Sequence, residues 1–366
     1  MTLRFLVALC LSCLTLPALA ARTLDLYAED AILSQNADQE DQDEAVADAL
    51  SRVLVRATGN ASVLDAEPVI AALESPNRFL STFRFERSDV TLTNVLGESV
   101  PTKQMIMQFD RGAVEQLLID NGLPIWGVKR PVTLVWLADR LDGDDHILAD
   151  SDHGASAERF KEYARERGIP VTLPVMDLDD TLNVNFTDVY GVFPGTIDAA
   201  SQRYQADAVL IGRITRQGNE YQASFVYRLQ DERRRYQVSA SSRTGLMEAL
   251  VDQMSLRLAN QYAVVLDPSL AGQLTLRITA VDNLATLAEV ERYLQSLNLI
   301  TRATLRQVEP NAVRFDLEIS GNEGQLRDIL ALDDRLTQFD DVSIEGRAGF
   351  DTSDLLYQWV AEATAP

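Results

Sequence analysis

The segment 177–182, D-L-D-D-T-L, carries the residues with the most definite chemical potential in this chain. Two aspartates two residues apart after an apolar stretch could supply a nucleophile and a magnesium ligand for phosphate-ester hydrolysis. That chemistry also needs a later basic residue and a second acidic pair at a strand end. No lysine follows Lys161, and the obvious pair, Asp333-Asp334, ends a helical pattern. We therefore favour a loop whose aspartates cap the next segment, and keep a magnesium-dependent phosphatase using Asp177 and Asp179 as an alternative.

The loop 142–154 holds both histidines of the chain, His146 and His153, together with five aspartates. Imidazole and carboxylate are ligands that zinc and copper accept. The spacing fits no zinc motif, and the calcium-loop pattern that Asp150 and Asp152 begin fails at Gly154. A flexible solvated loop is favoured, a metal-binding protein using the two histidines is a further alternative, and cation binding by residues 142–153 or 177–180 stays open.

Other chemical motifs are incomplete. The chain has no G-x-S-x-G, no G-x-x-x-x-G-K and no G-x-G-x-x-G segment. The basic run Arg233-Arg234-Arg235 is interpreted as a solvated tight hairpin turn rather than an anion site, because the surrounding charge is acidic. We therefore assign no catalytic, cofactor-binding or metal-binding residue and expect a protein that is not an enzyme.

The first twenty residues have the order of a secretory leader: Arg4, an apolar core, and Ala18-Leu19-Ala20, with cleavage expected between Ala20 and Ala21. The apolar core is too short to span a membrane. Both cysteines, Cys10 and Cys13, lie in the leader, so the processed chain contains no thiol. These features predict a periplasmic protein without a transmembrane segment.

The chain is strongly acidic, with a formal net charge of −22 that becomes −23 when Arg4 leaves with the leader. Such a surface repels phosphate backbones and makes nucleic acid a poor partner. A processed chain of this length is expected to fold as two or three domains on hydrophobic cores alone.

Residues 21–128 are expected to form an α+β domain. A strand near Leu24 and Leu26 precedes a helix that opens at the acidic run 38–44 and ends at Gly59, with a short helix at 67–74 next. A strand at 105–109 and a helix at 114–122 complete the unit, and residues 123–129 are interpreted as a linker. Three aromatic residues have spacings that suit packing on this domain's core: Phe79, Phe83 and Phe85.

Residues 129–268 are expected to form a three-layer α/β domain with a mixed sheet, built around the apolar run 130–138. That run reads R-P-V-T-L-V-W-L-A and lacks polar alternation, which is typical of a strand buried on both faces. Further apolar strands are expected at 171–176 and 206–214, joined by helices, one of them capped by Thr196. Loops that leave the carboxyl ends of parallel strands share one side of the sheet, so the histidine loop and the Asp177 loop are expected to emerge together.

Residues 269–347 have the order β-α-β-β-α-β of the ferredoxin-like split motif, with a last strand at 342–344. Val313, Phe315, Leu317 and Ile319 alternate strictly with charged residues, which indicates a strand with one buried face. Residues 348–366 are interpreted as an amphipathic C-terminal tail that carries Leu355, Leu356 and Trp359.

Three stretches, R-P-V-T-L-V-W-L-A, G-I-P-V-T-L-P-V-M-D-L-D-D and S-Q-R-Y-Q-A-D-A-V-L-I-G-R-I, resemble an exported proteobacterial family, domain of unknown function 2066. The resemblance implies an exported protein of this architecture and no particular activity. The middle domain is also similar to the N-terminal domain of the Tol–Pal system's periplasmic propeller protein, and to domains of curli-secretion and flagellar basal-body accessory proteins. Segment 177–182 resembles the motif of haloacid-dehalogenase-type phosphatases over six residues.

These observations together predict a periplasmic, non-enzymatic interaction or scaffold component of the cell envelope. Assembly proteins among the fold-level relatives imply an envelope protein as partner. Homo-oligomerisation is left open.

Overall fold

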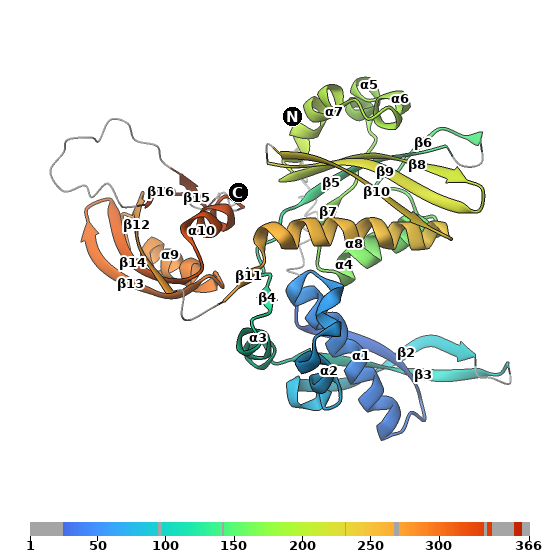
Figure 1. Ribbon diagram of the computed structural model, residues 1–366, viewed down its shortest axis with the longest axis horizontal. Coiled ribbons are helices and arrows are strands. Elements are labelled where there is room, and N and C mark those ends of the chain that lie inside the picture. Colours follow the sequence, from blue (N-terminus) through green and yellow to red (C-terminus); the bar gives the residue numbers. More distant parts are fainter. Residues whose placement is uncertain are drawn as a thin grey trace, which may run out of the picture.

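The computed structural model describes residues 25–93, 97–140, 143–230, 232–266, 271–332, 335–338 and 355–360. Helices and strands are interspersed along the described part of the chain, and the strands form four β-sheets (Figure 1). The protein is therefore a mixed α/β molecule with several separate cores. The predicted leader with Cys10 and Cys13, the residues Asp142 and Asp333-Asp334, and the predicted strand 342–344 lie outside the described residues.

The N-terminal body is a three-stranded antiparallel sheet of order β1-β3-β2 with helices on one face. Its strands are β1 Ala28–Ser34, β2 Leu80–Thr93 and β3 Ser99–Phe109. Its helices are α1 Gln39–Thr58, η1 Ala61–Asp65, α2 Glu67–Leu73, η2 Pro76–Phe79 and α3 Arg111–Asp120.

Helix α1 follows its sequence signals closely. Asp38 and Asp41 form a reciprocal capping box at its start, and Gly59 ends it in the left-handed conformation with φ 72°. Its apolar face, including Val46, Leu50 and Val53, is fully buried against the sheet. The predicted helix is confirmed.

Two expectations for this body are wrong. The first described strand begins at Ala28, after Leu26, and Leu24 lies outside the described residues. Phe79 is buried, but Phe83 and Phe85 are 52% and 42% exposed, because they lie on the edge strand β2, whereas their cross-strand neighbours Met107 and Met105 on the central strand β3 are buried.

The middle body is a six-stranded mixed sheet in which β10, β9, β8, β5 and β6 are successive neighbours and β7 also pairs with β5. Its strands are β5 Thr133–Asp139, β6 His146–Ile147, β7 Val171–Thr172, β8 Ala208–Gln217, β9 Glu220–Leu229 and β10 Glu232–Ala240. Its helices are α4 Ala155–Glu166, α5 Leu178–Asn183, α6 Phe186–Tyr190, α7 Pro194–Ser201, η4 Gln202–Tyr204 and α8 Arg243–Tyr262.

Strand β5 is buried along its whole length, and the prediction of a strand covered on both faces is confirmed. Val135 and Leu137 point into a core shared with α4 and α8, whereas Leu134 and Trp136 point into a core formed with α6 and α7. Figure 1 shows these helix groups on opposite sides of the sheet. Strand β5 runs parallel to both β7 and β8, as a strand inside a crossover sheet should.

Several middle-body details differ from expectation. Strand β7 ends at Thr172, because Pro174 cannot continue the ladder. Helix α7 begins with Pro194 after the N-cap residue Phe193, so Thr196 lies inside the helix and does not cap it. Arg233, Arg234 and Arg235 lie in the edge strand β10 rather than in a turn.

The C-terminal body is a five-stranded sheet of order β13-β14-β12-β16-β15 with two helices. Its elements are β12 Ala271–Thr279, α9 Leu284–Ser296, β13 Ile300–Glu309, β14 Ala312–Ser320, α10 Glu323–Leu330, β15 Leu336–Gln338 and β16 Leu355–Trp359. The predicted alternation of β14 is confirmed, since Val313, Phe315, Leu317 and Ile319 are all buried.

Residues 355–359 of the predicted amphipathic tail form strand β16 of the C-terminal sheet, so the segment is amphipathic as predicted but is not a separate tail. This strand pairs in parallel with β12 and antiparallel with β15, and so separates the two. Leu355, Tyr357 and Trp359 enter the core, whereas Gln358 is exposed. The alternation is that of a half-buried strand.

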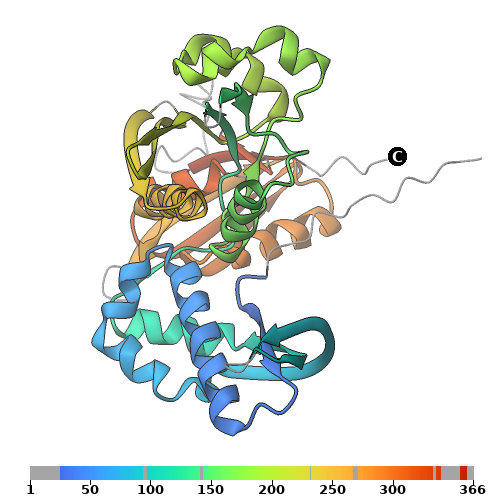
Figure 2. The same ribbon diagram turned by 90° about the vertical axis from the view of Figure 1, so that its right-hand side faces the viewer.

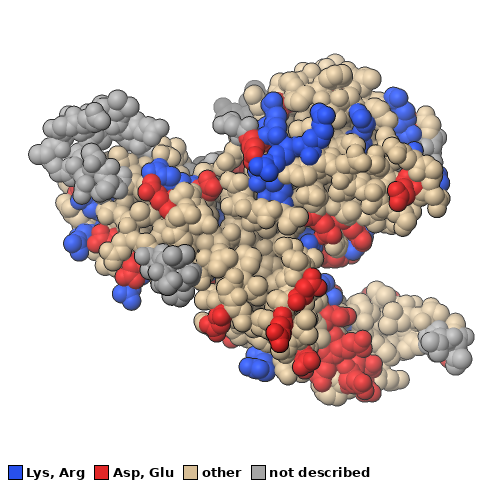
Figure 3. Space-filling model, viewed as in Figure 1, with Lys and Arg blue, Asp and Glu red and all other residues tan. Residues whose placement is uncertain are grey.

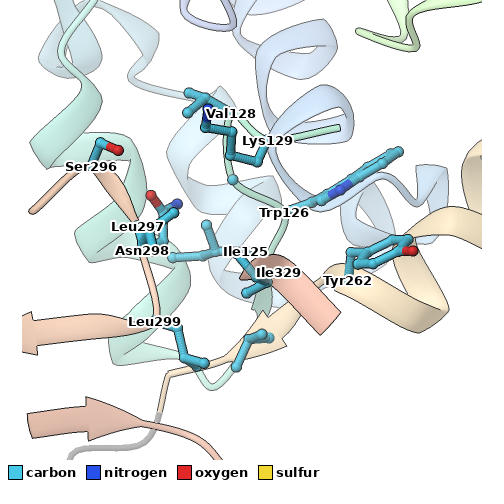
Figure 4. Close-up of a pocket in the computed structure, with 12 residues that line it drawn as sticks. Ile125, Trp126, Val128, Lys129, Tyr262, Ser296, Leu297, Asn298, Leu299 and Ile329 are labelled. Carbon is cyan, nitrogen blue, oxygen red and sulfur yellow. The ribbon is translucent and has the colours of Figure 1, made fainter. Parts of the chain in front are cut away.

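The three bodies meet around the segment 124–130. Strand β4 Pro124–Ile125 pairs with β11 Val264–Val265, and Trp126 is almost fully buried. A small cavity of about 20 Å³ lies there, between Trp126, Tyr262 and residues 296–299 of the C-terminal body (Figure 4). The segment interpreted as a linker is therefore packed between the bodies.

Candidate functional site

A cleft opens beside the carboxyl ends of β5 and β7, where the loops that follow these parallel strands meet. Its volume is about 460 Å³. The lining residues come from both predicted loops and are Asp145, His146, Ile147, Ala149, Ser151, Asp152, Met176, Thr181, Val184 and Phe186. The prediction that the histidine loop and the Asp177 loop emerge on the same side of the sheet is thus confirmed.

The histidine wall of the cleft is held by hydrogen bonds. His146 Nε2 lies 2.8 Å from Asp152 Oδ2, and the same carboxylate accepts the backbone N–H of Ala149. The Lys161 ammonium donates to the carbonyl oxygens of Asp150 and Asp152 at 2.7 and 2.9 Å. The loop expected to be flexible is therefore tied to helix α4.

The second histidine lies apart from the first. His153 Nδ1 is 3.0 Å from Glu158 Oε1, and the histidine side chain is 82% exposed. The hydrogen bond from His153 is the main cause that lowers the pKa of Glu158. Each histidine thus has a carboxylate of its own, and within the described ranges no group of three or more His, Cys, Asp or Glu side chains could hold a metal ion.

Asp177 and Asp180 on the opposite wall are engaged by Arg203. Asp177 caps α5 by accepting the Asp180 N–H, and its two oxygens accept Arg203 Nη1 and Nη2 at 2.8 and 2.6 Å. The Arg203 guanidinium, with the Asp180 N–H second, holds the pKa of Asp177 far below its usual range. Asp177 is therefore the N-cap of α5, as the loop interpretation predicted, and also the ion-pair partner of Arg203.

Asp180 is buried, unlike its neighbour Asp179, whose side chain is 79% exposed. The Asp180 carboxylate accepts the Met176 N–H at 2.9 Å and the Tyr204 hydroxyl. Burial, and then the hydrogen bond to Asp180, raises the pKa of Tyr204 to about 12. Arg203 and Tyr204 were not predicted from sequence, since no local pattern links them to residues more than twenty positions earlier.

Exposed apolar side chains lie in and just before α5, the helix whose Thr181 lines the cleft. Leu178 and Leu182, four residues apart on α5, are 72% and 73% exposed, and Val175 is 55% exposed. Residues four apart on a helix lie on the same face, so the two leucines form one patch. The sequence signal was present, as an i, i+4 leucine pair in an acid-rich segment, but its exposure could not be predicted.

Arg140 forms the cationic part of the site. Its guanidinium carbon lies 4.8 Å from the ring centroids of both Phe186 and Tyr190, and its Nε donates to Asp145 at 2.6 Å. The arginine thereby joins α6 to the histidine wall. The arrangement offers apolar contact and hydrogen-bond acceptors side by side, which suits binding.

Two arginines of the predicted basic run form ion pairs. Arg233 contacts Asp198 of α7 at 2.5 Å, and Arg234 contacts Glu232 at 2.6 Å. Figure 3 shows basic side chains gathered over the middle body and acidic side chains over the N-terminal body on the face in view. The arginine run is thus integrated into the acid–base pairing of the sheet edge.

Comparison with known families gives two matches. Residues 273–360 match the family DUF2066, and residues 20–127 match Domain of unknown function (DUF8605). The predicted resemblance to domain of unknown function 2066 is thereby confirmed, for the C-terminal body rather than for the three middle stretches on which it was based. No curated protein and no solved structure matches the chain.

Among the described helices, none combines the length and the hydropathy that a membrane crossing requires.

Proposed function

We propose that this protein is a non-enzymatic interaction component of the bacterial cell envelope, located in the periplasm, and that it binds a segment of another envelope protein at the cleft beside β5. The observation that carries the proposal is the pair of exposed leucines, Leu178 and Leu182, on α5, the helix whose Thr181 lines this cleft. Large apolar side chains exposed together are typical of binding surfaces.

The charge of the cleft indicates the chemistry of the partner segment. Asp145 and Asp152 line one wall, and the exposed Asp179 lies on α5 between the two leucines. An extended peptide with an aliphatic residue next to a lysine or arginine would fit both features. Its apolar side chain would contact Met176 and Val184, and its cation would face the carboxylates.

The proposal includes location and organisation. Location rests on the leader-like residues 1–20, with cleavage between Ala20 and Ala21. For organisation we propose three modules, with boundaries near residues 128 and 268. The last would be a ferredoxin-like module that has gained β16 between its first and fourth strands, and the middle one a three-layer α/β module.

Site-specific crosslinking in cells tests the binding surface. A photoreactive amino acid at Leu182 should give an adduct with an envelope protein. The same group at Leu284, a leucine of α9 that is 80% exposed, should give none. Leu178→Asp should abolish the adduct at position 182 while the protein accumulates normally in the periplasm. Equal adduct patterns from both positions would show that exposure alone causes capture.

A further inference from the structure

Strand β2 forms an uncovered edge of the N-terminal sheet. Within the described residues it pairs with β3 alone, and all but two of its 14 residues are exposed. Figures 1 and 2 both show the β2–β3 hairpin extending beyond the helices of this body. An open edge of this kind carries unpaired N–H and C=O groups and is a template for a further strand.

The regular part of this edge is short and well defined. Residues 82–87 pair with residues 103–108 of β3 in continuous register, and an irregularity follows between Arg87 and Thr91. A partner strand can therefore follow only the segment around residues 82–88, T-F-R-F-E-R-S.

The two faces of the segment carry different chemistry. Phe83 and Phe85 share one face, with their rings edge to face and centroids 5.7 Å apart. Arg84 and Glu86 share the other face, with side chains 67% and 49% exposed and a 2.9 Å contact between Arg84 Nε and Glu86 Oε1. Cross-strand neighbours on each face would decide which partner pairs here.

We propose that β2 pairs antiparallel with β2 of a second copy of this chain, about a two-fold axis through Phe85. In that register Phe85 faces its own copy, and each Arg84 lies opposite the partner's Glu86. Each Phe83 lies opposite the partner's Arg87. Both faces are then complementary, with two opposite-charge pairs on one and an aromatic pair flanked by two arginine–phenylalanine contacts on the other.

The two registers shifted by one residue on either side are disfavoured by charge. A two-fold axis perpendicular to the sheet leaves every side chain on its own face of the sheet. Directly opposed residues of an antiparallel pair also share a face, so this axis must pass through a residue and not between two residues. An axis through Arg84 opposes two arginines, and an axis through Glu86 opposes two glutamates. Like charges directly opposite destabilise a strand pair.

Cysteine crosslinking tests the register. In a chain with Cys10 and Cys13 replaced by serine, Phe85→Cys should oxidise to a disulfide-linked dimer, because the two β-carbons face each other across the axis. Phe83→Cys, on the same face and similarly exposed, is the control. Its two copies would be four residues apart along the strands, about 14 Å at ~3.4 Å per residue, and should stay monomeric. Absence of the disulfide at position 85, or equal crosslinking at both positions, would overturn the proposal.

Charge exchange tests the same interface without cysteine. Arg84→Glu and Glu86→Arg should each raise the dimer dissociation constant at least about tenfold in sedimentation equilibrium at low salt, because each creates two like-charge pairs. The double variant Arg84→Glu/Glu86→Arg restores the pairs and should return within about threefold of the unaltered chain. An unaltered chain that stays monomeric at every concentration, or a double variant as weak as the single ones, would refute the pairing.

Discussion

Arg130 is a buried cation that connects three parts of the molecule. Five hydrogen bonds run from its guanidinium to the backbone carbonyls of Arg56, Trp126, Gly127, Arg167 and Gly168. These carbonyls belong to the last turn of α1, the segment before β5, and the end of α4. Burial, and then the nearby charge of Arg56, lowers the pKa of Arg130 to about 9, so the group stays charged at neutral pH.

We predict that Arg130→Met lowers the free energy of unfolding by about 3 kcal/mol, because buried carbonyls lose their donors. Chemical denaturation measures the change. Arg235→Met, which alters an exposed arginine of β10, should change stability by less than about 0.5 kcal/mol and serves as the control. A change in the free energy of unfolding as small as that of the control would contradict the prediction and mean that water replaces the guanidinium in Arg130→Met.

At the scale of elements, the end of α1 shows how a helix cap also sets the docking of two bodies. Gly59 has a positive φ, and a β-carbon at this position would lie 2.6 Å from Ala259 Cβ and from the Trp126 ring. The Gly59 carbonyl accepts the buried Ser255 hydroxyl at 2.8 Å. The helix therefore ends against α8 and the segment 124–130, in a space that only glycine fits.

Gly59→Ala should lower the free energy of unfolding by about 3 kcal/mol, because the left-handed backbone penalty and the overpacking add up. Gly218→Ala separates the two terms, because Gly218 also has a positive φ but has open space around it. It should cost about 1 kcal/mol. Thermal unfolding of both variants checks the difference, and equal losses would contradict the predicted steric clash.

Variants in β16 would show how far the stability of the C-terminal sheet depends on this strand. Trp359 is 3% exposed and packs edge to face on Tyr293, with ring centroids 5.7 Å apart. Trp359→Ala should lower the stability of this body by about 3 to 5 kcal/mol. Gln358→Ala, on the solvent face of the same strand, should be nearly neutral. Hydrogen exchange of β12 and β15 reports the effect locally, and unchanged protection in Trp359→Ala would show that β16 is dispensable.

At the scale of the whole molecule, tyrosines whose pKa is raised on folding make stability depend on alkaline pH, and five of them have large shifts. Burial is the first cause in each case: it raises the pKa of Tyr163 and Tyr204 to about 12, and raises the pKa of three others further. Those three are Tyr27, Tyr227 and Tyr262. Because the folded-state pKa lies above the unfolded value near 10, the contribution is present below pH 10 and is lost as pH rises.

Tyr227, whose hydroxyl lies 2.8 Å from Thr133 Oγ1 in the core, allows a direct test. Between pH 9 and pH 11 the unaltered chain should lose about 1.4 kcal/mol more stability than Tyr227→Phe, because the unfolded tyrosine ionises while the buried one does not. Urea denaturation at both pH values measures the difference. Parallel losses in the two proteins would contradict it.

Local signals in the sequence were sufficient to predict those elements whose burial or ends are indicated by their own residue pattern. The continuous apolar run of β5 required cover on both faces, and the alternation of β14 required cover on one. The capping residues and the glycine at the ends of α1 defined a helix regardless of its neighbours. The common side of the two cleft loops followed from parallel strands alone.

Tertiary structure decided every feature that depends on residues far apart in the chain. Phe83 and Phe85 have core-like types, yet they are exposed because β2 is the edge strand of its sheet. Arg203 engages Asp177 and Asp180 only because α7, which η4 follows directly, packs against α5. Strand β16 joins its sheet between two strands distant in sequence. The sequence by itself determined the period and burial of its strongest elements, because these are local. Folding decided the partners, because pairing and exposure are set by contacts that no local pattern encodes.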